Sequence, residues 1–183
     1  ILLCITGSIA AYKACDLLRL LRKEGSNVQV AMTPSALNFV GETSFSALSN
    51  HEVITKVFPS KKGETGLEHI NLAIDLDAIL VAPATANILA KASSGIADDA
   101  LSLALSICEQ PTVFFPAMNY KMWQNPAIIE SVQKLRTRKK IIIEPEEGLL
   151  ASLHEGKGRL PSNTVIINTI QECFNVNLPL KNK

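Results

Sequence analysis

The feature that most constrains the fold is an almost continuous apolar run at residues 1–6, which ends in the turn Gly7-Ser8. A run of this length is typical of a strand that is buried on both faces of a parallel sheet. Residues 10–23 then carry apolar side chains at helical spacing, and Gly25 ends that helix. Because the same alternation recurs along the chain, the sequence predicts an α/β fold with three layers, a parallel sheet with helices on both faces.

Further predicted elements follow in the same order. The other strands are predicted at residues 27–33, 78–82, 112–115 and 140–143. The other helices are predicted at residues 34–40, 67–76, 85–93, 98–107, 126–137 and 164–174. Between residues 41 and 66 we expect a small helix and a strand near Val53, and residues 144–163 form a long Gly-rich segment. We expect one domain over residues 1–174 and a tail or linker over residues 175–183.

Composition excludes several classes of function. Apolar residues make up 47% of the chain and charged residues 19%, so the chain is expected to fold. The formal net charge of +1 gives no reason to expect nucleic acid or an anionic membrane as partner. The apolar runs are too short for a transmembrane helix. The four cysteines are scattered without the spacing of a metal site, which fits a cytoplasmic protein.

Ligands of such a sheet bind beyond the carboxyl ends of its strands, so the residues that follow each strand matter most. Most of these positions hold small, hydroxyl or amide residues, which suit a phosphate and a flat heterocycle. They are Gly7-Ser8, Thr33-Pro34, Pro83-Ala84-Thr85, Pro116-Ala117-Met118-Asn119 and the Gly-rich segment.

Two of these turns open helices. Gly7-Ser8 lacks the three glycines of a dinucleotide fingerprint, so binding of NAD in that mode is not expected. A Gly-Ser turn before a helix can still hold one phosphate, although Ser8 could equally be a plain N-cap. Thr85 would cap the next such helix and Asn87 would point its amide across the site, with an ordinary capped helix start as the alternative.

Three other features carry possible chemistry. Asn119 follows a buried strand directly, where its amide can bind a carboxylate or a carbonyl without bringing charge; packing of the neighbouring Met and Trp residues is the alternative. The pKa of a histidine would suit His69 for acid–base work if it faces the site, although a structural role is also open. The basic segment 156–159 is predicted to be a flexible tip, either a lid over an anionic substrate or a surface loop.

These motifs occur in the same order in a known family. They are residues 5–13, Glu68-His69-Ile70, residues 82–87, residues 95–99 and residues 116–123, the last of which matches P-x-M-N-x-x-M-W at every fixed position. Over residues 1–169 the chain resembles the homo-oligomeric flavin-containing cysteine decarboxylases, and among them the phosphopantothenoylcysteine decarboxylases of coenzyme A synthesis. Many bacterial members continue into a synthetase domain, and Lys183 stands where a linker to it would begin.

The resemblance implies a flavodoxin-like or Rossmann-like fold that forms trimers, in some members a dodecamer of four trimers, with FMN at a subunit contact. It implies that the flavin is lined by Gly7, Ser8, Ile9, Thr33, Thr85, Ala86, Asn87, Ile88 and Ala117. His69 matches the active-site histidine, and Asn119 matches the asparagine that holds the substrate carboxylate, with Met122 beside it. Residues 151–159 match the substrate-covering flap, which places Ala151, Lys157 and Arg159 at the substrate.

The implied reaction is the FMN-dependent decarboxylation of 4'-phospho-N-pantothenoylcysteine to 4'-phosphopantetheine. The cysteinyl group is oxidised to a thioaldehyde, CO2 leaves, and the resulting ene-thiol is reduced. The chain departs from the family at Ser152, where the family carries a catalytic cysteine that the reductive half requires. A hydroxyl is a poorer proton donor than a thiol of pKa ~8.5, so we expect oxidation and decarboxylation to proceed while reduction stalls.

Other readings remain open on the same scaffold. Decarboxylases of peptide C-terminal cysteines share the signature at residues 116–123, whereas flavin prenyltransferases lack it. The Lys-containing loop at residues 11–13 and the basic segment at 156–159 favour the coenzyme A branch. A catalytically inactive, flavin-binding regulatory subunit is conceivable because of Ser152, although such relatives usually carry long acidic extensions.

Overall fold

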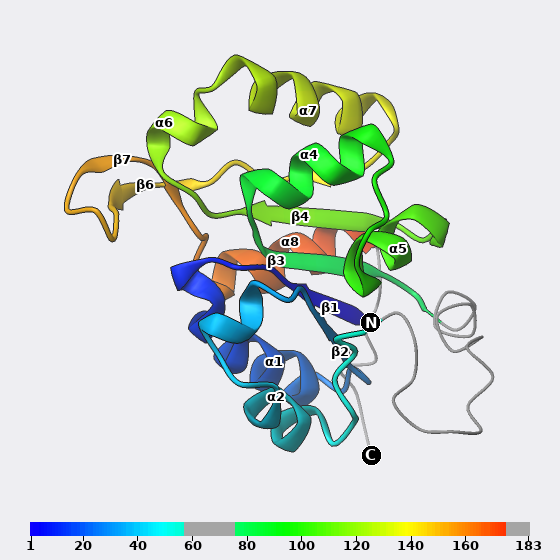
Figure 1. Cartoon of the computed structure of the whole chain (residues 1–183). Coiled ribbons are helices and arrows are strands. Elements are labelled where there is room, and N and C mark those ends of the chain that lie inside the picture. The colour runs from blue at the N-terminus through cyan, green and yellow to red at the C-terminus, as the bar shows by residue number, and fades with distance from the viewer. Residues whose placement is uncertain (57–75, 175–183) are drawn as a thin grey trace.

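A computed structural model describes residues 1–56 and 76–174. Within them, one parallel sheet has the strand order β2-β1-β3-β4-β5 (Figure 1). Its strands are β1 (Leu2–Ile5), β2 (Gln29–Met32), β3 (Ile79–Ala84), β4 (Thr112–Pro116) and β5 (Ile141–Ile142). This is the flavodoxin-like order. The predicted three-layer fold is therefore confirmed, and each of its five strands lies where the apolar runs predicted one.

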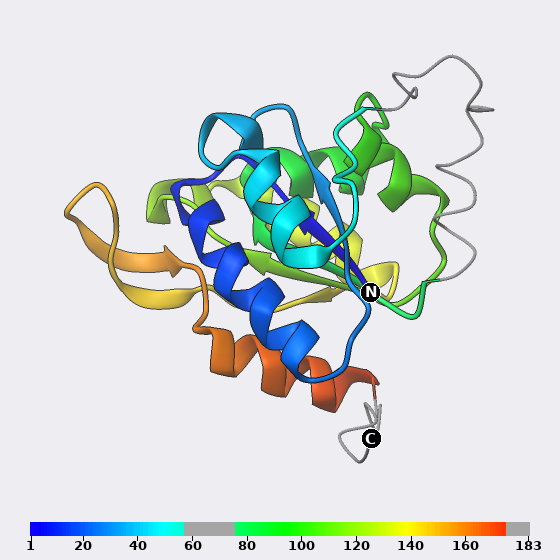
Figure 2. The same ribbon diagram turned by 90° about the horizontal axis from the view of Figure 1, so that it is seen from below.

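The two faces of the sheet are covered by different helices, because successive residues of a strand point to opposite faces. Leu3 and Ile5 of β1 belong to one core, with α1 (Lys13–Lys23) and α8 (Asn163–Phe174) packed on that face. Leu2 and Cys4 belong to the other core, which is covered by α4 (Ala86–Ser94), α5 (Ala100–Ile107) and α7 (Pro126–Thr137). Figure 2 shows α1 and α8 side by side on their face. None of the helices in the described ranges is long and apolar enough to cross a membrane.

The smaller elements differ most from the sequence-based expectations. The helix predicted at residues 34–40 is only the 3-10 turn η2 (Ala36–Asn38), and α2 (Glu42–Ser49) is the small helix expected after it. The strand expected near Val53 is a single bridge in which Ile54 pairs with Ala31, because only one residue of this polar segment bonds to the sheet edge. The helix expected at residues 67–76 lies outside the described residues except for Leu76. His69 also lies outside them.

The Gly-rich segment forms an antiparallel hairpin, β6 (Glu146–Leu149) and β7 (Glu155–Arg159), that stands beyond the sheet beside α6 (Tyr120–Trp123) (Figure 1). The prediction of a flexible tip at residues 156–159 is therefore wrong, since β7 contains them. The glycines of β7 let this strand approach the backbone at Met118 closely, because they carry no side chain. A Cβ on Gly158 would lie 2.1 Å from the carbonyl oxygen of Met118, and the Met118 N–H donates to the Gly158 carbonyl at 2.9 Å.

Candidate functional site

A pocket of about 550 Å³ lies beyond the carboxyl ends of β1, β3 and β4. The chain leaves β1 and β3 in opposite directions across the sheet, and such a switch point is where sheets of this kind bind ligands. The turns after these three strands form one wall, with η1 (Ile9–Tyr12) and the start of α1, and the hairpin forms the opposite wall. The lining residues are Gly7–Ala10, Tyr12, Lys13, Thr85, Ala86, Ala117–Asn119, Met122, Leu149–Ser152 and Gly158–Leu160.

The buried side chain of Thr6 joins the tips of β1 and β3. Its hydroxyl donates to the Pro83 carbonyl at 2.7 Å and accepts from the Thr85 N–H at 3.0 Å. Two separate strand ends are thereby held in one geometry. Sequence reasoning did not assign Thr6 to the site, although a hydroxyl residue in the last position of a buried run, just before a Gly-Ser turn, was a usable signal.

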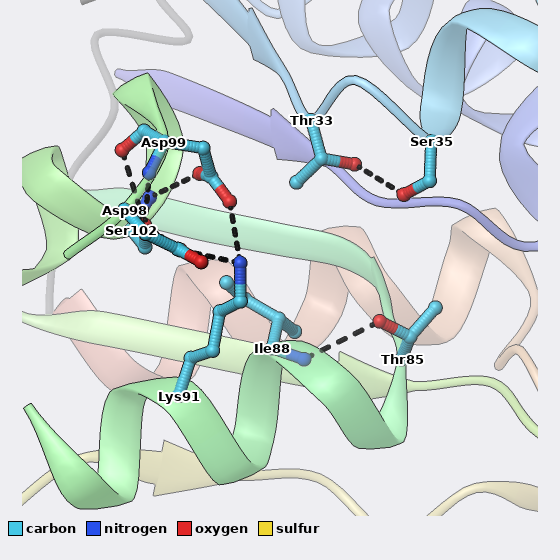
Figure 3. Close-up of polar contacts among 8 residues, drawn as sticks. All are labelled: Thr33, Ser35, Thr85, Ile88, Lys91, Asp98, Asp99 and Ser102. Carbon is cyan, nitrogen blue, oxygen red and sulfur yellow. Dashed lines mark hydrogen bonds and ion pairs between the residues drawn. The ribbon is translucent and has the colours of Figure 1, made fainter. Parts of the chain in front are cut away.

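The wall formed by the strand tips is rich in neutral polar groups. Ser8 caps η1 by accepting from the Ala10 N–H at 3.2 Å. Thr85 caps α4 by accepting from the Ile88 N–H at 3.4 Å (Figure 3). The hydroxyls of Thr33 and Ser35 lie 3.1 Å apart in the loop after β2 (Figure 3).

This loop packs directly on the turn after β1. A Cβ on Gly7 would lie 2.5 Å from the Ser35 hydroxyl oxygen, so only glycine allows the contact. Hydroxyls and backbone N–H groups at a helix start are the donors that a phosphate ester requires. The donor set of this wall therefore fits a flavin mononucleotide.

Not every residue predicted at the flavin reaches the pocket. Gly7, Ser8, Ile9, Thr85, Ala86 and Ala117 line it, whereas Thr33, Asn87 and Ile88 do not. Each step along α4 rotates the side chain by about 100°, so Ile88 turns into the core and Asn87 is exposed to solvent. Thr33 is buried, its hydroxyl lies 3.1 Å from that of Ser35, and neither residue lines the pocket.

Asn119 stands at the N-cap of α6 and lines the pocket. Its side-chain oxygen accepts from the Lys121 N–H at 2.9 Å. Among the described residues its amide nitrogen has no hydrogen-bond partner, so this nitrogen remains available to donate to a ligand oxygen. Met122, one helical turn on, contributes an apolar surface beside it.

The tip of the hairpin brings Ala151 and Ser152 to the pocket. Leu153 adopts a positive φ of 60° there, and its N–H donates to the Leu150 carbonyl at 2.9 Å. The ring nitrogen Nδ1 of His154 lies 2.8 Å from the Ser152 carbonyl oxygen. Ser152 therefore lines the pocket from a turn whose backbone is held by these two local hydrogen bonds.

The two basic residues of β7 have different surroundings. Lys157 pairs with Glu144 at 2.9 Å and does not line the pocket, whereas Arg159 does. Arg136 of α7 reaches the same carboxylate at 2.7 Å. Partial burial raises the pKa of Glu144, but hydrogen bonds from Lys157 and Arg136 outweigh it and leave the pKa below its ordinary value. Glu144 thus fastens the hairpin to α7.

A second ion cluster lies between α4 and the start of α5 (Figure 3), and none of its residues lines the pocket. Lys91 pairs with Asp98 and, at 2.9 Å, with Asp99, which also caps α5 in a reciprocal capping box with Ser102. Hydrogen bonds to Asp98 and then Asp99 raise the pKa of Lys91. The cluster ties α4 to α5 and so fixes the helix whose first residues line the pocket.

Fold and site together define a flavodoxin-like nucleotide-binding protein. The chain matches the family described as Flavoprotein over residues 1–175, and it belongs to that family. The resemblance found in the sequence is thereby confirmed.

Two relatives illustrate the match. The chain is 42% identical over 185 residues to the coenzyme A biosynthesis bifunctional protein CoaBC of Bacillus subtilis, which covers 100% of this chain but 45% of that protein. It is 39% identical over 174 residues to a probable phosphopantothenoylcysteine decarboxylase of Streptococcus mutans, covering 94% of this chain and 97% of that protein. The chain thus spans less than half of the bifunctional relatives and nearly all of the shorter one.

Solved structures agree with these relatives. One is a cysteine-to-serine mutant of PPC decarboxylase complexed with pantothenoylaminoethenethiol, with a TM-score of 0.83 and 28% identity over 96% of this chain and 97% of that one. Another is the FMN-dependent cysteine decarboxylase SpaF, with a TM-score of 0.80 and 31% identity over 96% of both chains.

Proposed function

We propose that this chain binds FMN and decarboxylates 4'-phospho-N-pantothenoylcysteine on the way to 4'-phosphopantetheine. The observation that carries the proposal is the shared pocket, which is lined both by Asn119, in the turn after β4, and by Ser152, at the tip of the hairpin. The Streptococcus mutans relative, similar over nearly its whole length, is named for this activity.

FMN fits the wall formed by Gly7, Ser8, Thr85, Ala86 and Ala117. When bound, it would supply the two-electron redox chemistry that neither amides nor hydroxyls can provide. The residues of the chain would orient the substrate against it, and the apolar side chains of Met122 and the hairpin would keep water from the reacting carbon.

Asn119 is suited to holding the carboxyl group that is lost. A lysine or arginine there would stabilise the charged ground state, which raises the barrier to losing CO2. An amide N–H orients the carboxylate without neutralising it. The oxygen of the same amide already accepts from the Lys121 N–H, which orients the side chain, and its nitrogen is the donor left for a ligand.

Ser152 would interrupt the reaction after CO2 has left. By resemblance the family carries cysteine here, and a serine hydroxyl is a far weaker acid than a thiol of pKa ~8.5. We expect the decarboxylated ene-thiol to accumulate, because its reduction lacks a proton donor. The cysteine-to-serine mutant of PPC decarboxylase, solved with an ethenethiol compound, supports this expectation. His69, which lies outside the described residues, stays a predicted acid–base residue.

A peptide with a C-terminal cysteine is the second candidate substrate. The solved peptidyl-cysteine decarboxylase EpiD has a TM-score of 0.78 and 25% identity, and such a peptide also ends in a cysteinyl carboxylate. Parallel assays of CO2 release from both substrates would separate the two, and faster release from the peptide would overturn the proposed one.

The assembly proposed with this function is a trimer or a dodecamer. Large apolar side chains are exposed around the mouth of the pocket, among them Ile9 and Tyr12 at 60% each and Leu149 at 59%. A second copy covering them would complete the flavin site. Analytical ultracentrifugation tests this, and a monomer at micromolar concentration would contradict it.

The direct test mixes FMN-loaded protein with 4'-phospho-N-pantothenoylcysteine without oxygen. We expect loss of the visible flavin absorbance and stoichiometric release of CO2. Asn119→Leu should retain flavin and release CO2 at least about 100-fold more slowly, because a misplaced substrate reacts more slowly by about that factor. A protein that takes up no flavin, or one whose flavin does not respond to substrate, would refute the proposal.

A further inference from the structure

Two cationic residues line the pocket, one on each of its walls. Lys13, the first residue of α1, lies on the side of the strand turns, and Arg159, the last residue of β7, lies on the hairpin side. Among the described residues, those that line the pocket include no aspartate and no glutamate. The described part of the pocket wall therefore carries positive charge without a carboxylate to balance it.

The described part of the chain does not neutralise the charges of these two cations. Among the described residues, neither Lys13 nor Arg159 makes an ion pair or a side-chain hydrogen bond. By contrast, Lys157 pairs with Glu144, and Arg138 donates to the Ser93 carbonyl at 2.8 Å. An unpaired lysine and arginine that converge on one cavity are suited to an anionic ligand.

The arginine side chain lies against the other strand of the hairpin. The guanidinium nitrogen Nη1 of Arg159 lies 3.5 Å from the point where a Cβ on Gly148 would stand, an ordinary contact distance. Gly148 also has a φ of 156°, a conformation that other residues rarely adopt. The strand opposite Arg159 therefore offers it no acidic side chain at this position.

The three anionic groups expected in the pocket can be assigned by elimination. The flavin phosphate has the helix starts at Ser8 and Thr85, and the substrate carboxylate has Asn119. The phosphate of the substrate remains for the two cations. We propose that Lys13 and Arg159 bind this phosphate monoester and thereby select a phosphorylated substrate over a peptide cysteine, an inference that rests on the proposed function.

Calorimetry of the FMN-loaded protein tests this without turnover. The ligands are 4'-phosphopantetheine and pantetheine, which differ only in the phosphate. The unaltered protein should bind the phosphorylated ligand at least tenfold more tightly. Lys13→Gln and Arg159→Gln should each lose about tenfold or more of that affinity and leave pantetheine binding unchanged. Arg19→Gln and Lys23→Gln, which remove exposed charges from the same helix α1, serve as controls and should change neither.

Several outcomes would overturn the inference. Equal affinity of the unaltered protein for both ligands would do so, as would equal losses for both ligands in the variants. Loss of flavin absorbance in Lys13→Gln or Arg159→Gln would instead assign these cations to the flavin phosphate. Failure of the proposed function can be told apart from failure of this inference. In the first case no CO2 is released from a cysteine substrate, even if the phosphate still strengthens binding.

Discussion

The two walls of the pocket are held in place in different ways. The strand-turn wall depends on buried groups, with the Thr6 hydroxyl joining two strand ends and Gly7 packed on Ser35. The hairpin wall depends on one backbone contact at Gly158 and on exposed ion pairs around Glu144. A change in the first wall must disturb the sheet, whereas a change in the second can leave the sheet intact. The first wall therefore suits a permanently bound cofactor, and the second suits a substrate that enters and leaves.

The largest expected effect comes from the hairpin tip. Ser152→Cys should restore reduction of the ene-thiol, because a positioned general acid contributes about 100-fold or more to a rate. Production of 4'-phosphopantetheine, followed by mass spectrometry, should rise by that factor, while flavin content and melting temperature stay unchanged. Ser152→Ala is the matched control and should release CO2 without forming this product. Full turnover by the unaltered chain would contradict the prediction.

The opposite wall should respond to the loss of one buried hydroxyl. Thr6→Val keeps the shape but leaves the Pro83 carbonyl and the Thr85 N–H without their partner, which costs about 1–3 kcal/mol. Urea unfolding should show this loss, and FMN should dissociate more readily because the turns after β1 and β3 separate. Thr6→Ser keeps the hydroxyl and should behave nearly as the unaltered protein. Equal stability of both variants would show that the hydroxyl does not hold this wall.

The same contrast explains how far the sequence could predict the structure. The sheet was predictable because strands buried on both faces must be apolar throughout, as residues 1–6 and 78–82 are. The turns after β1, β3 and β4 followed from the sheet, since parallel strands bring their carboxyl ends to one edge. Gly7, Thr85 and Asn119 therefore line one pocket, as the sequence predicted.

The hairpin was not predictable in the same way. Its strands are polar and Gly-rich, and this composition is explained by the close contacts of Gly158 with the Met118 backbone and of Gly156 with the Tyr120 side chain. This contact joins residues that are far apart in the chain, so no local pattern shows it. The pairing of Lys157 with Glu144 is likewise a consequence of tertiary packing.

A methyl group at position 158 would test how the hairpin is seated. Gly158→Ala places a Cβ 2.1 Å from the Met118 carbonyl oxygen, which cannot be accommodated without movement. We expect a local cost of about 1–3 kcal/mol, met by lifting the hairpin, so hydrogen exchange should quicken at Met118 and in β6 and β7. The sheet amides should stay protected. Gly41→Ala, which has nothing within 4 Å of the added Cβ, is the matched control.

The smallest expected effect concerns the ion pairs that tie the hairpin to α7. The pKa of Glu144 lies below its ordinary value of 4.5, so the folded state holds this group charged more readily than the unfolded state does. The stabilisation is therefore present above pH 4.5 and is lost as the pH falls through the lowered pKa. Because the pair is half exposed, Glu144→Gln should cost less than about 1 kcal/mol at pH 7.

The measurement is the stability of the unaltered protein and of Glu144→Gln across the acid range, compared at equal salt. The difference between the two should shrink below pH 4.5, because the protonated carboxyl no longer pairs with Lys157 and Arg136. Glu130→Gln, which removes an exposed carboxylate of α7 paired with Lys134, controls for surface charge and should leave hydrogen exchange in the hairpin unchanged. A difference that persists undiminished at low pH would mean that Glu144 holds the hairpin by packing and not by charge.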